Sequence, residues 1–391
     1  MHKRRLLLRK TRKVVRTAAK NSTRATSLTH RLFRYPASMS PLLARQLITS
    51  LTRPGNLVLD PFCGGGTTAI EALALRRKVV CSDINPLAHF VTSAKAIPLT
   101  PNAITQLEDW CIRTHLELSK TKNFRSKPLV SRGGIGHSPK THGMLLALRN
   151  RAQRIKRLSV RRIALLFTLQ VGKLCFDARL LPPTPELLLR LFKRTYLSGI
   201  TSLREYSQIC TQKKSLHPKE FLTLYRCSVN QLRSRIRQRR KKIALVLTSP
   251  PYPGTHVLYN RWQIHGRRET DLPYSLLNLR DGKSSAYYTF GDRKQKDNAS
   301  YFNGMHDALI ELRTLLHAST LVVQVIAFSR PRTQLKKYRT MMNDAGYEEI
   351  DFTATSGQLL QRHVPNRRWY ATAGNTESIA REYVIFHRPK L

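Results

Sequence analysis

The sequence is poor in acidic residues. Its 391 residues include 23 Asp and Glu against 69 Lys and Arg, so the formal net charge is +46. So large a charge repels itself within the folded chain, and added acidic groups would serve solubility better. The imbalance therefore indicates a polyanionic partner, with nucleic acid favoured over an anionic membrane surface.

The sequence also lacks long apolar runs and paired cysteines. No apolar run approaches the roughly 18 residues that span a membrane, and the six cysteines form no C-x-x-C pair. We therefore expect a protein of the reduced cytoplasm, associated with the nucleoid, with no metal site and no membrane partner. Residues 1–59 contain no Asp or Glu, as in some organellar transit segments. Because the basic bias continues along the chain, we favour a nucleic-acid-binding arm over residues 1–29.

A glycine-rich segment near the N-terminal end has the pattern of a cofactor loop. Residues 57–59 (LVL) predict a strand that ends at Asp60, and Gly64, Gly65 and Gly66 follow before the next helix. A second short strand ends at Asp83. In such units the glycines let a ligand approach the backbone, and the second acid accepts hydrogen bonds from ribose hydroxyls. An adenosine-containing cofactor is predicted, either a dinucleotide or S-adenosylmethionine.

A second motif, TSPPYPG, follows the apolar run IALVL at residues 243–247. The run predicts a buried strand, and two adjacent prolines hold Ser249 extended and forbid a helix. The Ser249 hydroxyl and the Pro250 carbonyl could accept hydrogen bonds from an exocyclic amine while Tyr252 stacks on the ring. Taken alone, the segment is explained equally well as a proline-rich turn.

The remaining pattern alternates between strands and helices. Besides those already named, we expect strands at residues 321–328, 347–355 and 382–388, and helices at 40–51, 301–316 and 336–345. This alternation predicts an α/β fold with a mostly parallel sheet. Residues 101–240 have mainly helical periodicity and predict an inserted helical region.

Together DPFCGGGTT, TSPPY and FRYPASMSP resemble the S-adenosylmethionine-dependent amino-methyltransferases of DNA, which methylate exocyclic nitrogens. The serine of SPPY is similar to the N4-cytosine branch, whereas the N6-adenine branch usually carries Asp or Asn there. The resemblance covers about residues 33–96 and 245–388. It implies a Rossmann-like methyltransferase sheet built from residues 30–100 and 241–391, with residues 101–240 inserted.

The resemblance also implies roles for individual residues. S-adenosyl-L-methionine would be the cofactor, held by Tyr35, Pro36, Ser40, Asp60, Pro61, Phe62, Cys63, Gly64, Gly66, Thr67, Asp83, Ile84 and Asn85. The catalytic set Ser249, Pro250, Pro251 and Tyr252 would receive a flipped cytosine for direct in-line transfer, without a covalent adduct.

Double-stranded DNA is the expected partner, together with a companion restriction endonuclease. Candidate nucleic-acid contacts follow the SPPY motif or lie in the basic run before it: Arg239, Arg240, Arg261, Trp262, Arg267 and Arg268. Trp262 is as well explained as a core residue.

Four other functions fit part of the pattern. A tRNA guanine-N2 methyltransferase would share a related glycine loop and a Pro-Pro-Tyr site, although Ser249 argues against it. A DNA N6-adenine methyltransferase, a nucleic-acid-binding relative without turnover and an NAD-type oxidoreductase are the others, and the SPPY site disfavours the last two.

Overall fold

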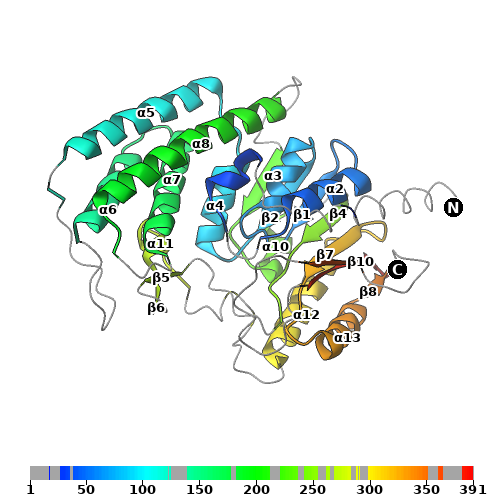
Figure 1. The fold of residues 1–391 in the computed structure, drawn as a ribbon. Coiled ribbons are helices and arrows are strands. Elements are labelled where there is room, and N and C mark those ends of the chain that lie inside the picture. The colour runs from blue at the N-terminus through cyan, green and yellow to red at the C-terminus, as the bar shows by residue number, and fades with distance from the viewer. Residues whose placement is uncertain are drawn as a thin grey trace.

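The computed structural model describes residues 17, 27–35, 38–121, 123–124, 139–177, 182–211, 221–236, 242–253, 261–264, 268–282, 288, 290, 298–350, 360–363 and 381–390. In this part of the chain a central sheet is flanked by helices, and a separate group of helices lies to one side of it (Figure 1). None of the described helices is long and apolar enough to cross a membrane.

The central sheet has the strand order β3-β2-β1-β4-β7-β10-β8, and β9 also pairs with β10. Its strands are β1 (Leu57–Asp60), β2 (Lys78–Ser82), β3 (Leu222–Tyr225), β4 (Ile243–Thr248), β7 (Leu321–Ile326), β8 (Tyr347–Glu349), β9 (Leu360–His363) and β10 (Arg381–Pro389). The pairs from β3 through β7 are parallel, whereas β10 runs antiparallel to its neighbours. The predicted Rossmann-like α/β fold is confirmed.

The order of the strands determines where a ligand can bind. β1 pairs with β2 on one side and with β4 on the other, so the chain order reverses at β1. In doubly wound sheets the loops after such strands diverge and leave a crevice at their carboxyl ends. Both predicted motifs follow strands of this reversal, the glycine loop after β1 and the SPPY segment after β4.

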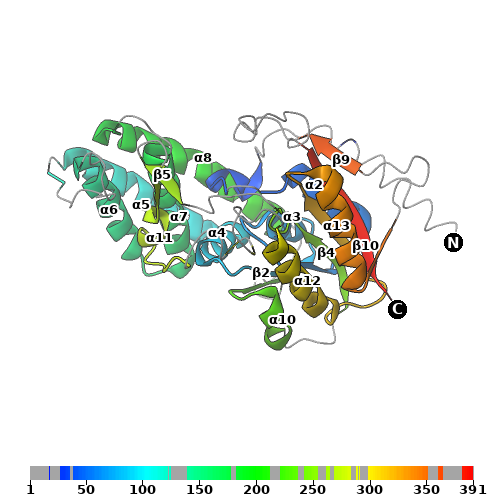
Figure 2. The same ribbon diagram turned by 90° about the horizontal axis from the view of Figure 1, so that it is seen from below.

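Helices cover both faces of the sheet, which explains why its central strands are apolar throughout. Leu245 and Leu247 of β4 pack in one core with α2 (Pro41–Leu51) and α3 (Thr67–Ala74). Val246 between them packs in a second core with α10 (Val229–Arg235), α12 (Ala299–Arg313) and α13 (Pro331–Asp344). Figure 2 shows α12 and α13 side by side against the sheet.

A third core belongs to the helices beside the sheet. These are η1 (Leu28–Leu32), α4 (Pro86–Ala96), α5 (Pro101–Lys120), α6 (Pro139–Gln153), α7 (Leu158–Phe176), α8 (Pro185–Thr211) and α11 (Leu272–Ser275). A small antiparallel pair, β5 (Trp262–Ile264) and β6 (Arg268–Thr270), packs against α7. Residues of α4 and η1 belong both to this third core and to the core that α2 and α3 form with the sheet. The group of helices therefore packs closely against the sheet.

Three strands, β3, β7 and β8, differ from the sequence-based expectation. β3 lies within residues 101–240, yet it pairs in parallel with β2 at the edge of the sheet, with Leu222 opposite Val79. The chain has therefore returned to the sheet before the basic run. β7 ends at Ile326 rather than at residue 328. β8 and β10 pair as expected, but β8 covers only 347–349, and residues 351–355 lie outside the described part.

Candidate active site

The carboxyl ends of β1, β2 and β4 open into a pocket of about 1030 Å³, a volume that includes space open to solvent. Its wall combines segments that are far apart in the sequence. It includes Tyr35, the Asp60–Gly65 segment, Asp83–Asn85, and Ser249–Tyr252. The two motifs predicted from the sequence therefore face the same cavity.

The glycine loop lies closely against Tyr35. Gly64 and Gly66 have positive φ angles of 47° and 79°, a conformation that glycine adopts readily. A β-carbon on Gly65 would lie 2.5 Å from the β-carbon of Tyr35, so no side chain fits there. Tyr35 therefore covers Gly65 on that side, and Tyr35, Gly64 and Gly65 all line the pocket.

Asp83 connects the glycine loop to the turn after β2. Its two carboxylate oxygens each accept one backbone amide, at 2.8 Å from Gly64 N and 2.8 Å from Asn85 N. Burial raises the pKa of this carboxyl to about 6. Each carboxylate oxygen has two lone pairs, so Asp83, which lines the pocket, can also accept hydrogen bonds from a ligand's hydroxyls.

Asp60 joins the two motifs directly. Its Oδ1 accepts hydrogen bonds from the Thr248 hydroxyl at 2.7 Å and from the Phe62 amide at 3.2 Å. The side chain is only 3% exposed, and burial raises its pKa to about 6. The end of β1 is thereby fastened to the end of β4, immediately before Ser249.

This buried carboxyl predicts a pH-dependent stability for the protein without ligand. A raised pKa means that Asp60 stabilises the fold below its ordinary pKa of 3.8 and that this stability is lost as the pH rises through about 6. The loss amounts to at most about 3 kcal/mol. Asp60→Asn keeps Oδ1 as an acceptor for Thr248 and Phe62, so its thermal unfolding midpoint should exceed that of the wild type at pH 7.5.

The difference between the two midpoints should shrink as the pH is lowered toward 4.5, because the wild-type carboxyl then becomes neutral. Thermal unfolding of both proteins across this range, followed by circular dichroism, measures it. An Asn variant whose advantage is the same at every pH would contradict the assignment to ionisation.

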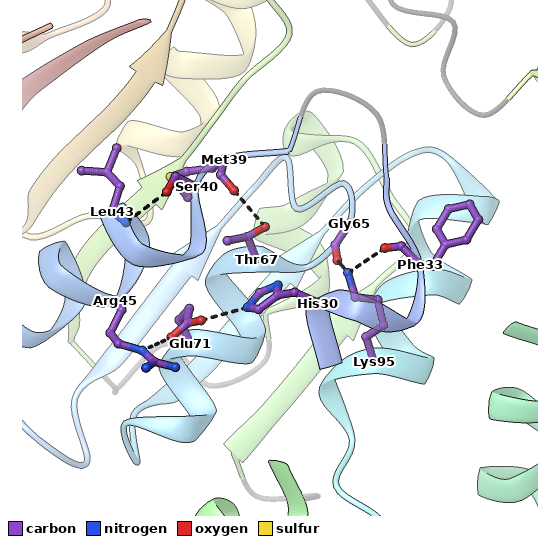
Figure 3. Close-up of polar contacts among 10 residues, drawn as sticks. All are labelled: His30, Phe33, Met39, Ser40, Leu43, Arg45, Gly65, Thr67, Glu71 and Lys95. Atoms are coloured by element: carbon purple, nitrogen blue, oxygen red, sulfur yellow. Dashed lines mark hydrogen bonds and ion pairs between the residues drawn. The ribbon is translucent and has the colours of Figure 1, made fainter. Parts of the chain in front are cut away.

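An N-terminal strap, defined here as residues 27–35 and 38–40, is held against the glycine loop by buried polar groups (Figure 3). The Lys95 ammonium on α4 donates to the carbonyls of Gly65 at 3.0 Å and Phe33 at 3.4 Å. Burial lowers the pKa of Lys95 to about 7. This lysine therefore ties the loop to the segment that carries Tyr35.

Glu71 on α3 makes the second connection. One of its oxygens lies 2.8 Å from His30 Nε2 of the strap, and the other accepts from Arg45 Nε of α2 at 2.7 Å. Burial is the main cause that lowers the pKa of His30, and Lys95 adds to it. Glu71 thus fastens η1 and α2 to the helix that begins at the glycine loop (Figure 3).

The SPPY segment is rigidly held at the opposite wall. The Tyr301 hydroxyl of α12 donates to the Pro251 carbonyl at 2.8 Å. Tyr252 is 6% exposed, and its hydroxyl donates to Glu382 on β10 at 3.0 Å. Ser249 Oγ lies 3.0 Å from the same hydroxyl. Ser249, Pro250, Pro251 and Tyr252 all line the pocket.

Most of the predicted cofactor residues border the same cavity, and a few do not. Those in the wall are Tyr35, Asp60, Pro61, Phe62, Cys63, Gly64, Thr67, Asp83, Ile84 and Asn85. Ser40 is buried and caps α2 by accepting from Leu43 N at 3.5 Å, and it is not part of the wall. Gly66 also lies outside the wall, and Pro36 lies outside the described residues.

Several wall residues were not predicted. Cys227, Ser228, Val229 and Asn230 follow β3, and Ser38, Met39, Tyr288 and Phe290 complete the set. The first four would have been expected only if β3 had been recognised, because loops after parallel strands meet at one edge of the sheet.

The predicted nucleic-acid contacts differ in burial, and some lie outside the described residues. Trp262 is 1% exposed and packs over Gly172 of α7, the position described by the alternative of a core residue. Arg261 forms an ion pair with Asp281 at 2.6 Å and is partly buried. The side chains of Arg239, Arg240, Arg267 and Arg268 lie outside the described part of the chain.

Residues 9–93, which include the strap, the glycine loop and Asp83, match the DNA methylase family that groups N6 and N4 methyltransferases. Over this segment the chain is similar to DNA methylases. This match does not distinguish the N4 branch from the N6 branch.

Two curated relatives show local similarity. The type II methyltransferase M.MvaI of Kocuria varians is 39% identical over 111 residues, which are 27% of this chain and 24% of that protein. A tRNA (guanine(10)-N2)-dimethyltransferase of Methanothermobacter thermautotrophicus is 48% identical over 56 residues, 14% of this chain and 17% of that protein. The chain therefore spans about a quarter or less of the length of these relatives.

Two solved structures show weak likeness over longer stretches. The rRNA methyltransferase aviRa from Streptomyces viridochromogenes has 12% identity and a TM-score of 0.34, covering 77% of this chain and 79% of its own. An rRNA methylase from Streptococcus thermophilus has 7% identity and a TM-score of 0.32, covering 91% and 99%.

Proposed function

We propose that this protein transfers a methyl group from S-adenosyl-L-methionine to the exocyclic N4 amine of cytosine in DNA. One observation carries the proposal: the glycine loop with Asp83 and the SPPY segment line the same pocket. The Thr248–Asp60 hydrogen bond of 2.7 Å fixes one motif relative to the other. A cofactor on the first wall would thus lie beside a base on the second.

The wall residues fit the cofactor chemically. Asp83 can accept hydrogen bonds from ribose hydroxyls, and the loop at Gly64 and Gly65 lets a ligand reach the backbone. Tyr35, Phe62 and Ile84 supply apolar surface in the same wall. When bound, S-adenosyl-L-methionine would supply an electrophilic methyl group. The protein needs to hold and orient the two reactants rather than provide strong acid or base chemistry.

The SPPY segment would orient the base. Ser249 Oγ and the Pro250 carbonyl can accept the two hydrogens of an exocyclic amine, and the Tyr252 ring can stack on the heterocycle. Extrusion of the base from a duplex costs a few kcal/mol of stacking and pairing, which these contacts would offset in part. The amine proton would leave after transfer, since a serine hydroxyl is a poor base.

Ser249 is the reason for preferring cytosine to adenine, following the resemblance of SPPY to the N4 branch. The tRNA (guanine(10)-N2)-dimethyltransferase among the relatives supports a second candidate, an amino group on an RNA base. A companion restriction endonuclease remains a prediction from the family resemblance.

The decisive experiment supplies the purified protein with labelled S-adenosylmethionine and either unmethylated duplex DNA or tRNA, then identifies the modified nucleoside after digestion. We expect N4-methylcytosine from DNA. N6-methyladenine would move the protein to the other branch, label found in tRNA alone would refute the DNA proposal, and cofactor binding without transfer to either polymer would indicate a binding protein.

A basic groove on the helices beside the sheet is our candidate for contact with DNA phosphates. It spans about 830 Å³, including space open to solvent, and is lined by one aromatic residue, three other uncharged residues and five basic ones: Gln106, Trp110, Arg113, Arg151, Arg154, Ile155, Lys156, Arg157 and Val160. Arg154 and Lys156 are exposed. Basic side chains of this kind contact the nucleic-acid backbone without reading sequence.

Replacing Arg154 and Lys156 together by glutamate should weaken DNA binding uniformly across sequences. If each contacts one phosphate, the slope of log K against log salt concentration should fall by about two. Fluorescence anisotropy with a labelled duplex at several salt concentrations measures this. The matched control replaces Lys336 and Lys337, exposed on α13, by glutamate. An equal loss in both double variants would show only a general charge effect.

A further inference from the structure

A chain of four polar side chains runs from the pocket into the sheet. It begins at Ser249 Oγ, passes through the Tyr252 hydroxyl to Glu382 Oε1, and continues from Glu382 Oε2 to Arg362 Nη1 at 2.7 Å. Glu382 is 1% exposed, and Arg362 is also buried. The last two residues are directly opposite each other in the antiparallel pair of β10 and β9. Nothing in the sequence motifs points to either of them.

The direction of each hydrogen bond in this chain follows from its buried end. A guanidinium only donates, and a carboxylate paired with it only accepts. The Tyr252 hydroxyl therefore directs its hydrogen toward Glu382, as the geometry has it. Its oxygen is left to accept, so the 3.0 Å contact with Ser249 places the serine hydrogen on Tyr252.

The direction of this hydrogen bond determines which hydrogen bonds Ser249 can form with a ligand. A serine hydroxyl in water donates or accepts with equal ease. Here its single hydrogen is directed at Tyr252, so the side chain faces the pocket with lone pairs only. It can then accept from an amine N–H but cannot donate to a carbonyl oxygen.

We propose that Glu382, held by Arg362, is a positioning residue that fixes the hydrogen-bond direction at Ser249 and so adapts the pocket to amino-bearing bases. This inference rests on the proposed function, because it assigns a substrate feature to the same site. Glu382 itself does not touch the substrate. It acts through Tyr252, whose ring it also holds in place.

Glu382→Gln reverses the network with little change in size. The amide oxygen must face Arg362, which only donates, so the amide nitrogen faces Tyr252 and donates to it. Tyr252 then directs its hydrogen to Ser249, and the serine hydrogen turns into the pocket against the amine. We expect kcat/KM for DNA methylation to fall by about tenfold to one-hundredfold. Cofactor affinity should stay within about twofold, because Asp83 and the glycine loop are untouched.

A double-mutant cycle with Tyr252→Phe separates this role from simple support of β9 and β10. The phenylalanine retains the stacking ring but removes the hydroxyl through which Glu382 acts. On that background Glu382→Gln should change the rate by less than about twofold. Glu382→Asp, which keeps an acceptor-only carboxylate, should recover part of the lost activity.

The outcomes are distinguishable from failure of the proposed function. If the wild type transfers no methyl group to DNA, the proposed function fails first. If the wild type is active, three results would each overturn the inference alone: a Glu382→Gln rate equal to wild type, a fully active Tyr252→Phe variant, or effects of the two substitutions that multiply independently. The Tyr252→Phe measurement stands even if Glu382→Gln does not fold.

Discussion

Replacing Asp83 by alanine is expected to weaken S-adenosylmethionine binding by about one-hundredfold or more. The substitution removes two things together. It deletes the proposed acceptor for the ribose hydroxyls, and it leaves the amides of Gly64 and Asn85 without the carboxylate that now holds each at 2.8 Å. The glycine loop and the turn after β2 then lose their common support.

Isothermal titration with S-adenosylmethionine, or with its demethylated product, measures the change. Asp109→Ala is a suitable control, because Asp109 is an exposed carboxylate on α5 that is not part of the pocket wall. Affinity of the Asp83 variant within about threefold of wild type would exclude Asp83 from the cofactor site.

Replacing Ser249 by alanine should slow methyl transfer rather than weaken cofactor binding, in contrast to the Asp83 substitution. The cofactor affinity is expected to remain near that of the wild type, because Ser249 belongs to the wall formed after β4. Methyl transfer should fall by about one-hundredfold to one-thousandfold, the usual cost of removing one oriented polar group from a reacting centre. Single-turnover rates with saturating cofactor and DNA isolate this step from binding.

Ser329→Ala provides the matched control for the serine substitution. Its hydroxyl lies near the same segment, 3.5 Å from the Pro253 carbonyl and 3.2 Å from Gln334 Oε1, but it does not line the pocket. We expect this variant to transfer methyl groups at close to the normal rate. A Ser249→Ala variant as active as the Ser329 control would show that the serine does not orient the amine.

The parts of the site that could be predicted from the sequence are those with local chemistry. Positive φ angles favour glycine, adjacent prolines restrict the backbone, and an acidic residue after a predicted strand is identified directly from the sequence. These rules indicated the loop at Gly64 and the segment at Ser249, and they led to the correct fold class. β3 is as short as β1 but was not predicted, because no glycine loop follows it to mark the end of a strand.

The groups that position these motifs could not be predicted, because their partners are distant in sequence. Lys95 contacts Gly65 thirty residues away, and Glu382 contacts Tyr252 at a separation of 130 residues. A charged residue on a helix or strand is ordinarily solvated, so the residue type alone predicts a position on the protein surface. Only the three-dimensional arrangement shows that these two are buried.

The pairing of β1 with β4 has a consequence for how the molecule forms. Asp60 and Thr248, hydrogen-bonded at the ends of these strands, are 188 positions apart, and a helical group with its own apolar core occupies much of the interval. During synthesis β1 therefore emerges long before β4, and the edge of β1 that pairs with β4 stays unpaired while those helices fold locally. Contacts between residues distant in sequence form slowly. The two halves of the pocket are thus made at different times, and the site exists only when the sheet closes.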